Sequence, residues 1–128
     1  MHPFRRHDND HGAAAVELAL VLPILILLLG GIIDFGFAFN TQISLTHAAR
    51  EGVRVEAIGT GDPETSALAA FSAPAASDVE ADVDRPCPDT NGARLVVKAN
   101  SQVFVLAFLP FVNSEIPLEG QAVMRCGG

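Results

Sequence analysis

The sequence predicts an α+β protein in which a long N-terminal transmembrane helix continues into an amphipathic helix and packs on a small antiparallel β-sheet. Three observations lead to this class. An apolar block fills residues 13–33, helical spacing of apolar residues continues to Ile58, and alternating segments separated by turns follow residue 77. Fewer than 100 residues follow the apolar block, so we expect one modest outer domain with a small core.

The apolar block has the length of a membrane span. Its 21 residues contain Glu17 as their only charge and make a helix about 31 Å long, which matches the hydrocarbon thickness of a bilayer. A core helix of a soluble protein is the alternative, but so small an outer domain cannot surround it. A cleaved secretory signal is also disfavoured, because bulky Phe35 and Phe37 stand where a signal-peptide site needs small residues.

The residues on either side of the span predict its orientation. Arg5 and Arg6 precede it, whereas Asp34 follows it and the next basic residue is Arg50. Because basic flanks stay in the cytoplasm, we expect the N-terminus inside and the acidic remainder, which carries most of the net charge of −7, outside.

The order of these features divides the chain into five expected segments. They are a cytoplasmic leader over 1–12, a transmembrane helix over 13–34, a helix extension over 35–58, a connector with a short helix over 59–77, and a small extracytoplasmic β domain over 78–128.

The extension carries apolar residues at helical spacing, which predicts one helix from about Ala14 to Ile58. Pro23 should bend or loosen this helix within the span. We expect the apolar stripe of the extension to be core, with a partner-binding surface as the alternative. The stripe comprises Phe35, Phe39, Ile43, Ala49, Val53 and Ala57.

The connector and the outer domain show one helix start and several strand patterns. Asp62 and Pro63 are typical of an N-cap and first helical residue, so we expect a short helix through about Phe71. Residues 78–84 alternate strictly between acidic and apolar and predict a strand. Residues 93–112 are apolar enough for one long or two short strands, and 116–126 can form a final strand.

The two cysteines, Cys87 and Cys126, both lie in the expected outer domain. An even number in an exported segment favours a disulfide, and the alternative is two unpaired thiols. A bridge would close a loop of about 40 residues and contribute roughly 3–4 kcal/mol in the chain-entropy model.

The sequence shows no pattern for catalysis or cofactor binding. We find no phosphate-binding glycine loop, no Ser-His-Asp set and no Cys-His metal spacing, so we expect no enzyme, cofactor, metal or small-molecule substrate. Sparse basic residues argue against nucleic acid. Histidines 2, 7 and 11 lie in the leader and His47 stands alone. A calcium site on the acidic face of 78–84 is an alternative to a solvated strand, but it lacks the loop spacing and turn glycine.

The start of the apolar block has a second notable pattern. Gly12 ends the polar leader and Glu17 is the fifth residue after it, inside the span. Together with "GAAAVELALVLPILILLLGGIIDFG" and the helix segment Ala-Ala-Arg-Glu-Gly at 48–52, this pattern resembles the TadE-like family of minor pseudopilins. These proteins belong to tight-adherence (Tad/Flp) pilus systems of the type IV pilin kind.

The resemblance implies a processing site and a partner for Glu17. A prepilin peptidase would cut after Gly12 and leave Ala13 as the new N-terminus, and Glu17 would neutralise the terminal amine of a neighbouring subunit. The implied partners are membrane lipid, the peptidase and other pseudopilins or pilins, at the bacterial cytoplasmic membrane. The alternatives are a Glu17 that only reaches toward the headgroups, and an uncleaved, single-pass envelope protein whose outer domain binds a partner.

Overall fold

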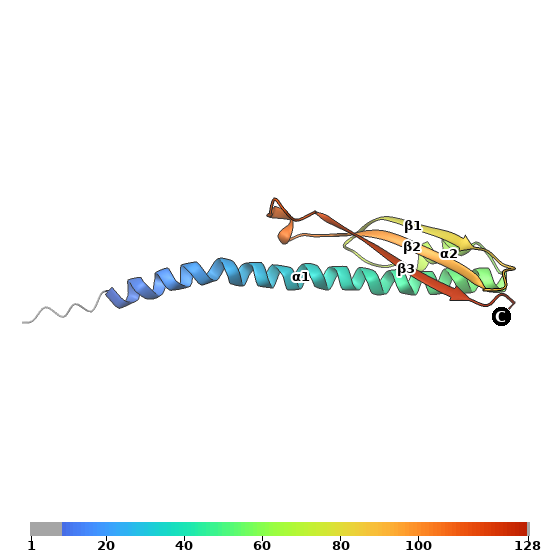
Figure 1. Cartoon of the computed structure of the whole chain (residues 1–128), viewed down its shortest axis with the longest axis horizontal. Coiled ribbons are helices and arrows are strands. Elements are labelled where there is room, and N and C mark those ends of the chain that lie inside the picture. The colour runs from blue at the N-terminus through green and yellow to red at the C-terminus, as the bar shows by residue number, and fades with distance from the viewer. Residues whose placement is uncertain (1–8, 128) are drawn as a thin grey trace, which may run out of the picture.

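The computed structural model describes residues 9–127 and has the predicted α+β architecture (Figure 1). A long helix carries a three-stranded sheet along its C-terminal half. Arg5 and Arg6, on which the predicted orientation rests, and His2 and His7 lie outside the described residues. The elements in chain order are α1 (Asn9–Ile58), α2 (Pro63–Ala70), β1 (Ala76–Arg85), β2 (Ala93–Gln102), the 3₁₀ helix η1 (Leu106–Phe108) and β3 (Glu115–Met124).

Helix α1 is continuous over 50 residues, which corresponds to about 75 Å. It begins at Asn9, five residues earlier than expected, so the end of the expected leader is helical. Pro23 lies inside the helix and does not end it. The span and its extension therefore form a single rod.

The sheet is antiparallel in the order β1-β2-β3, so β2 is the central strand. Leu95 of β2 pairs with Val83 of β1 on one side and with Ala122 of β3 on the other. The predicted alternation of β1 is confirmed, because its valines are half-buried against the core while its acidic residues are exposed.

Helix α2 confirms the predicted short helix and its cap. The Asp62 carboxylate accepts hydrogen bonds from the Thr65 hydroxyl and from the Thr65 backbone N–H, the latter at 3.0 Å. Both bonds lower the pKa of Asp62 below its ordinary value, and the bond from the Thr65 hydroxyl has the larger effect. The helix bridges α1 and β1.

Small residues set the distance between α1 and the sheet. A Cβ added to Gly52 would lie 2.7 Å from Leu95 Cδ1 and 2.8 Å from Ala67 Cβ. Where β3 crosses α1, a Cβ added to Gly120 would lie 2.5 Å from the backbone carbon of Leu45. The core between these elements consists mainly of Leu45, Ala48, Ala49, Val53, Ala67, Leu95, Val97 and Ala99.

The expectation that the apolar stripe belongs to the core is correct for only half of its residues. Ala49, Val53 and Ala57 are buried, but Phe35 and Ile43 remain 66% and 65% exposed. The sheet packs instead on the face of α1 with the smallest side chains, because backbone can approach closely there. The aromatic part of the stripe faces away from the domain.

The expectation of strand over the whole of residues 93–112 is also wrong in its second half. β2 ends at Gln102, and residues 103–112 form a loop that contains η1. Strand pairing stops at Gln102 because neither neighbouring strand extends further. β1 begins at Ala76, opposite Ser101, and β3 begins opposite Gln102.

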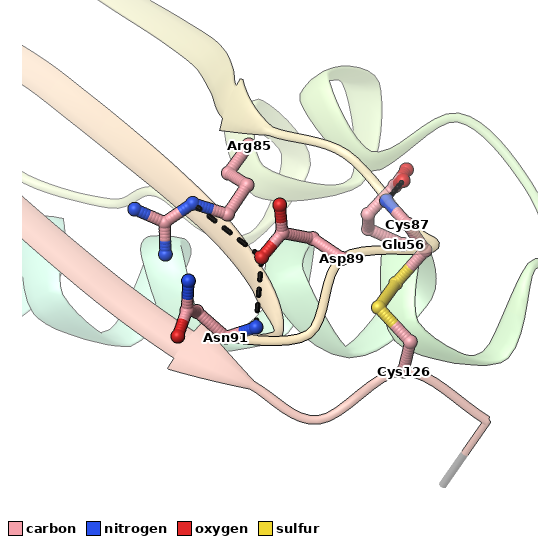
Figure 2. The surroundings of a disulfide bond; sticks show 6 residues. All are labelled: Glu56, Arg85, Cys87, Asp89, Asn91 and Cys126. Carbon is pink, nitrogen blue, oxygen red and sulfur yellow. Dashed lines mark hydrogen bonds and ion pairs between the residues drawn. A yellow bond between two sulfur atoms is a disulfide. The ribbon is translucent and has the colours of Figure 1, made fainter.

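The predicted disulfide is present between Cys87 and Cys126 (Figure 2). It joins the β1–β2 connection to the residues after β3, near the C-terminal end of α1. The Cys87 N–H donates to the Glu56 carboxylate at 2.8 Å, and the Gly127 N–H donates to the Ala57 carbonyl at 3.0 Å. The disulfide and these two hydrogen bonds hold the β1–β2 connection and the residues after β3 against the C-terminal end of α1.

Candidate functional site

The N-terminal half of α1 presents a continuous apolar surface to its surroundings. Among the described residues, α1 is the one helix long and apolar enough to cross a membrane, and only 6% of its most apolar 18-residue stretch is buried in the protein. A core helix of the outer domain is thereby excluded. Such an exposed apolar surface requires lipid or a protein partner, which supports a single-pass membrane protein.

The three residues expected to act in processing and pairing lie on this exposed part of α1. Gly12 has open space around its Cα, and Ala13 and Glu17 are exposed. Within residues 12–127, no side chain forms a hydrogen bond or ion pair with the Glu17 carboxylate. The fold therefore leaves Glu17 available to a group from outside the described chain.

The helical period places Glu17 on a definite face. Phe35 follows it by 18 residues, which is five turns at 3.6 residues per turn. Phe35 and Phe39 lie along that face with their rings tilted to one another and the ring centroids 5.1 Å apart. The face turns away from the sheet, so a partner docked on it would meet both Glu17 and the aromatic residues.

Asp34 anchors a loop, a role that the sequence did not predict; there it served only as a flank of the span and as part of the segment that resembles the family. It is 4% exposed, and its carboxylate accepts the backbone N–H groups of three consecutive loop residues. Phe104 and Val105 donate to Oδ1 at 3.0 and 3.1 Å, and Leu106 donates to Oδ2 at 2.8 Å. Asp34 thus caps η1 and ties the β2–β3 loop to the end of the span.

One signal in the sequence points toward this contact, because an acid next to an apolar span is costly unless it gains partners. The signal does not name the partner, since the contact joins residues 70 positions apart.

The acidic face of β1 does not form an evident metal site. In the part of the chain that the structure covers, no group of three or more His, Cys, Asp or Glu side chains is arranged to hold an ion. Asp84 instead pairs with Arg94 of the neighbouring strand at 3.4 Å.

Comparison with known proteins identifies the same region of the chain as the sequence motifs. Residues 12–54 match the family model described as TadE-like protein. Searches of the curated proteins and of the solved structures return no match. The match covers about a third of the chain, from Gly12 through the helix segment that packs on the sheet. Over residues 12–54, the chain is therefore similar to TadE-like proteins.

Proposed function

We propose that this protein is a minor pseudopilin-like membrane protein that assists assembly of a Tad/Flp pilus and is processed after Gly12 by a prepilin peptidase. The observation that carries the proposal is the family match over residues 12–54, combined with an exposed membrane-length helix that holds Gly12 and Glu17 at its start. The outer domain would be displayed beyond the membrane on the stiff extension of that helix.

The orientation in this proposal has the N-terminus in the cytoplasm and the sheet outside the cytoplasmic membrane. Arg5 and Arg6 before the span support it by the positive-inside rule. The disulfide between Cys87 and Cys126 supports it independently, because such bonds persist in oxidising compartments and are rare in the cytosol.

Glu17 would act by pairing with a terminal ammonium group. A carboxylate at the centre of a span costs about 2.5–3.5 kcal/mol by insertion scales and less near the interface, and a close ion pair with good geometry offsets that cost. Cleavage after Gly12 creates such an ammonium on Ala13 of a neighbouring subunit. The exposed aromatic residues on the same face of α1 would pack against that neighbour farther out.

Mass spectrometry of membrane-extracted protein, produced with and without a prepilin peptidase, tests the processing step. We expect the peptidase to yield a chain that starts at Ala13, and Gly12→Leu to block the cut. Gly36→Ala is the matched control, because Gly36 also lies in α1 with open space around it. Retention of Met1 in the native host would contradict the proposal.

One structural observation favours a second candidate, an uncleaved envelope protein anchored by a single span. Gly12 lies inside α1 rather than in an extended segment, so a peptidase would have to unwind the first helical turns to reach the bond after it. The same mass measurement separates the two candidates, since this one keeps its leader when the peptidase is present.

A further inference from the structure

The loop over residues 103–112, here called the apolar loop, has no role in the function proposed above. Its sequence, VFVLAFLPFV, contains no charged or polar side chain. Figure 1 shows it leaving the end of the sheet and extending alongside α1 toward the helix N-terminus. Three phenylalanines remain on its surface: Phe104, Phe108 and Phe111 are 56%, 66% and 80% exposed. So many exposed aromatic rings in a short segment mark an interaction surface.

The apolar loop is fastened to the outer end of the span by specific contacts. Asp34 accepts three of its backbone N–H groups, as described above. Val105 packs against Gly30 so closely that an added Cβ on that glycine would lie 2.4 Å from the valine Cγ1. The Phe104 ring meets Phe37 edge to face, with centroids 5.4 Å apart. The loop is thus held in register with the span.

The tip of the loop lies beside the span itself, on the N-terminal side of Asp34. Phe108 and Leu109 share a shallow apolar groove with Leu22, Pro23, Ile26 and Leu27. The span residues of this groove lie seven to twelve residues before Asp34, or about 10–18 Å along the helix axis. If the span ends at Asp34, the tip lies between the sheet's side of the hydrocarbon layer and its middle, because each half of that layer is about 15 Å thick.

Six of the nine backbone N–H groups in the loop have a partner within the protein, which a segment at that depth needs for its polar groups. The N–H groups of residues 104–106 bond to Asp34. Val103 donates to the Ser114 carbonyl at 2.8 Å, Leu109 to the Leu106 carbonyl at 3.0 Å, and Val112 to the Leu109 carbonyl at 3.1 Å. Pro110 carries no N–H.

We propose that the apolar loop is a second membrane-inserted element, whose phenylalanines contact lipid acyl chains beside α1 on the side of the bilayer that carries the sheet. Lipid is favoured over a protein occupant because the tip lies against the lipid-facing side chains of the span and continues their surface. The inference rests only on α1 crossing the membrane, and neither processing after Gly12 nor a role in pili is needed for it.

The absence of tryptophan and tyrosine from the chain allows a direct test. Phe108→Trp and, separately, Phe111→Trp place a single fluorophore in the loop of the full-length protein, reconstituted in phosphatidylcholine vesicles. Leu25→Trp provides a fluorophore in the span, and Val123→Trp provides one on β3 that is 58% exposed. Each variant is measured with phosphatidylcholine brominated on its acyl chains and with aqueous iodide.

We expect bromolipid to quench Phe108→Trp about as strongly as Leu25→Trp, and iodide to quench mainly Val123→Trp. Two loop variants are used so that the test remains valid if one of them fails to fold. If both loop tryptophans respond as Val123→Trp does, the inference is overturned. It is also overturned if they are shielded from both quenchers even at low protein-to-lipid ratio while bromolipid quenches Leu25→Trp, since protein would then cover the loop. Failure of bromolipid to quench Leu25→Trp would instead refute the span itself, and with it the proposed function.

Discussion

Asp34 illustrates how one residue can serve two environments. It ends the apolar block in the sequence, and in the fold its carboxylate replaces strand partners for three backbone N–H groups. Asp34→Ala should leave these donors unpaired, so we expect a loss of about 3 kcal/mol in unfolding free energy and faster proteolysis within residues 103–112. Denaturation in detergent, followed by circular dichroism, measures the first effect.

Asp82→Ala is the matched control for this change. Asp82 lies on the exposed face of β1, and its substitution should alter stability by no more than about 0.5 kcal/mol. If the two alanine variants unfold alike, Asp34 does not anchor the loop.

Glu17 differs from Asp34 because its partner must come from another molecule. Glu17→Ala removes a costly charge from the span, so the variant should insert at least as well as the parent protein. We expect it to lose co-purification with partner pseudopilins, measured by affinity capture from solubilised membranes. Glu64→Ala, which removes an exposed carboxylate from α2, should retain the partners. Unchanged capture by Glu17→Ala would argue against pairing through this residue.

At the scale of the elements, the buried face of α1 depends on the absence of side chains. Gly52→Ala should destabilise the protein by about 1–3 kcal/mol, because the new methyl group meets Leu95, Ala67 and the Pro63 carbonyl within 2.8 Å. Gly36→Ala should have the opposite sign and stabilise by up to about 1 kcal/mol, since its site is open and alanine favours helix. Chemical denaturation of both variants tests this contrast, and a shared sign would refute it.

The same elements show what the sequence could and could not predict. The span, the continuous helix, α2, β1 and β3 follow from local signals, namely apolar length, helical spacing, a cap and alternation. The face of α1 that receives the sheet does not, because Phe35 and Ile43 satisfy a core pattern as well as Ala48 and Val53 do. The close approaches at Gly52 and Gly120 decide between these faces, and they depend on residues distant in the chain.

The candidate site divides in the same way. The pairing of Cys87 with Cys126 could be predicted because only one pair exists, and it is confirmed. Gly12 and Glu17 could be proposed because their spacing is local, and their roles stay a prediction. The contact of Asp34 with the apolar loop could not be predicted, since an uncharged run of ten residues is compatible with strand until its partners are known.

At the scale of the whole molecule, the disulfide affects stability and also indicates the membrane topology. The core consists largely of alanine and valine, so a bridge that spans 39 positions should contribute much of the stability, roughly 3–4 kcal/mol in the chain-entropy model. We expect reductant to lower the denaturation midpoint of the parent protein toward that of a variant with Cys87→Ser and Cys126→Ser. The double variant itself should not respond to reductant.

The bond also reports on which side of the membrane the sheet lies. With the N-terminus in the cytoplasm, the cysteines should be oxidised in living cells, and protease added to spheroplasts should remove the sheet while α1 remains in the membrane fraction. Alkylation in intact cells before lysis, followed by gel shift after reduction, measures the oxidised fraction. Replacement of Arg5 and Arg6 by Glu should weaken the orientation signal and increase the reduced, protease-protected population. Free thiols in the parent protein under these conditions would indicate the opposite topology, with the sheet in the cytosol, because the cytosol keeps such a pair reduced.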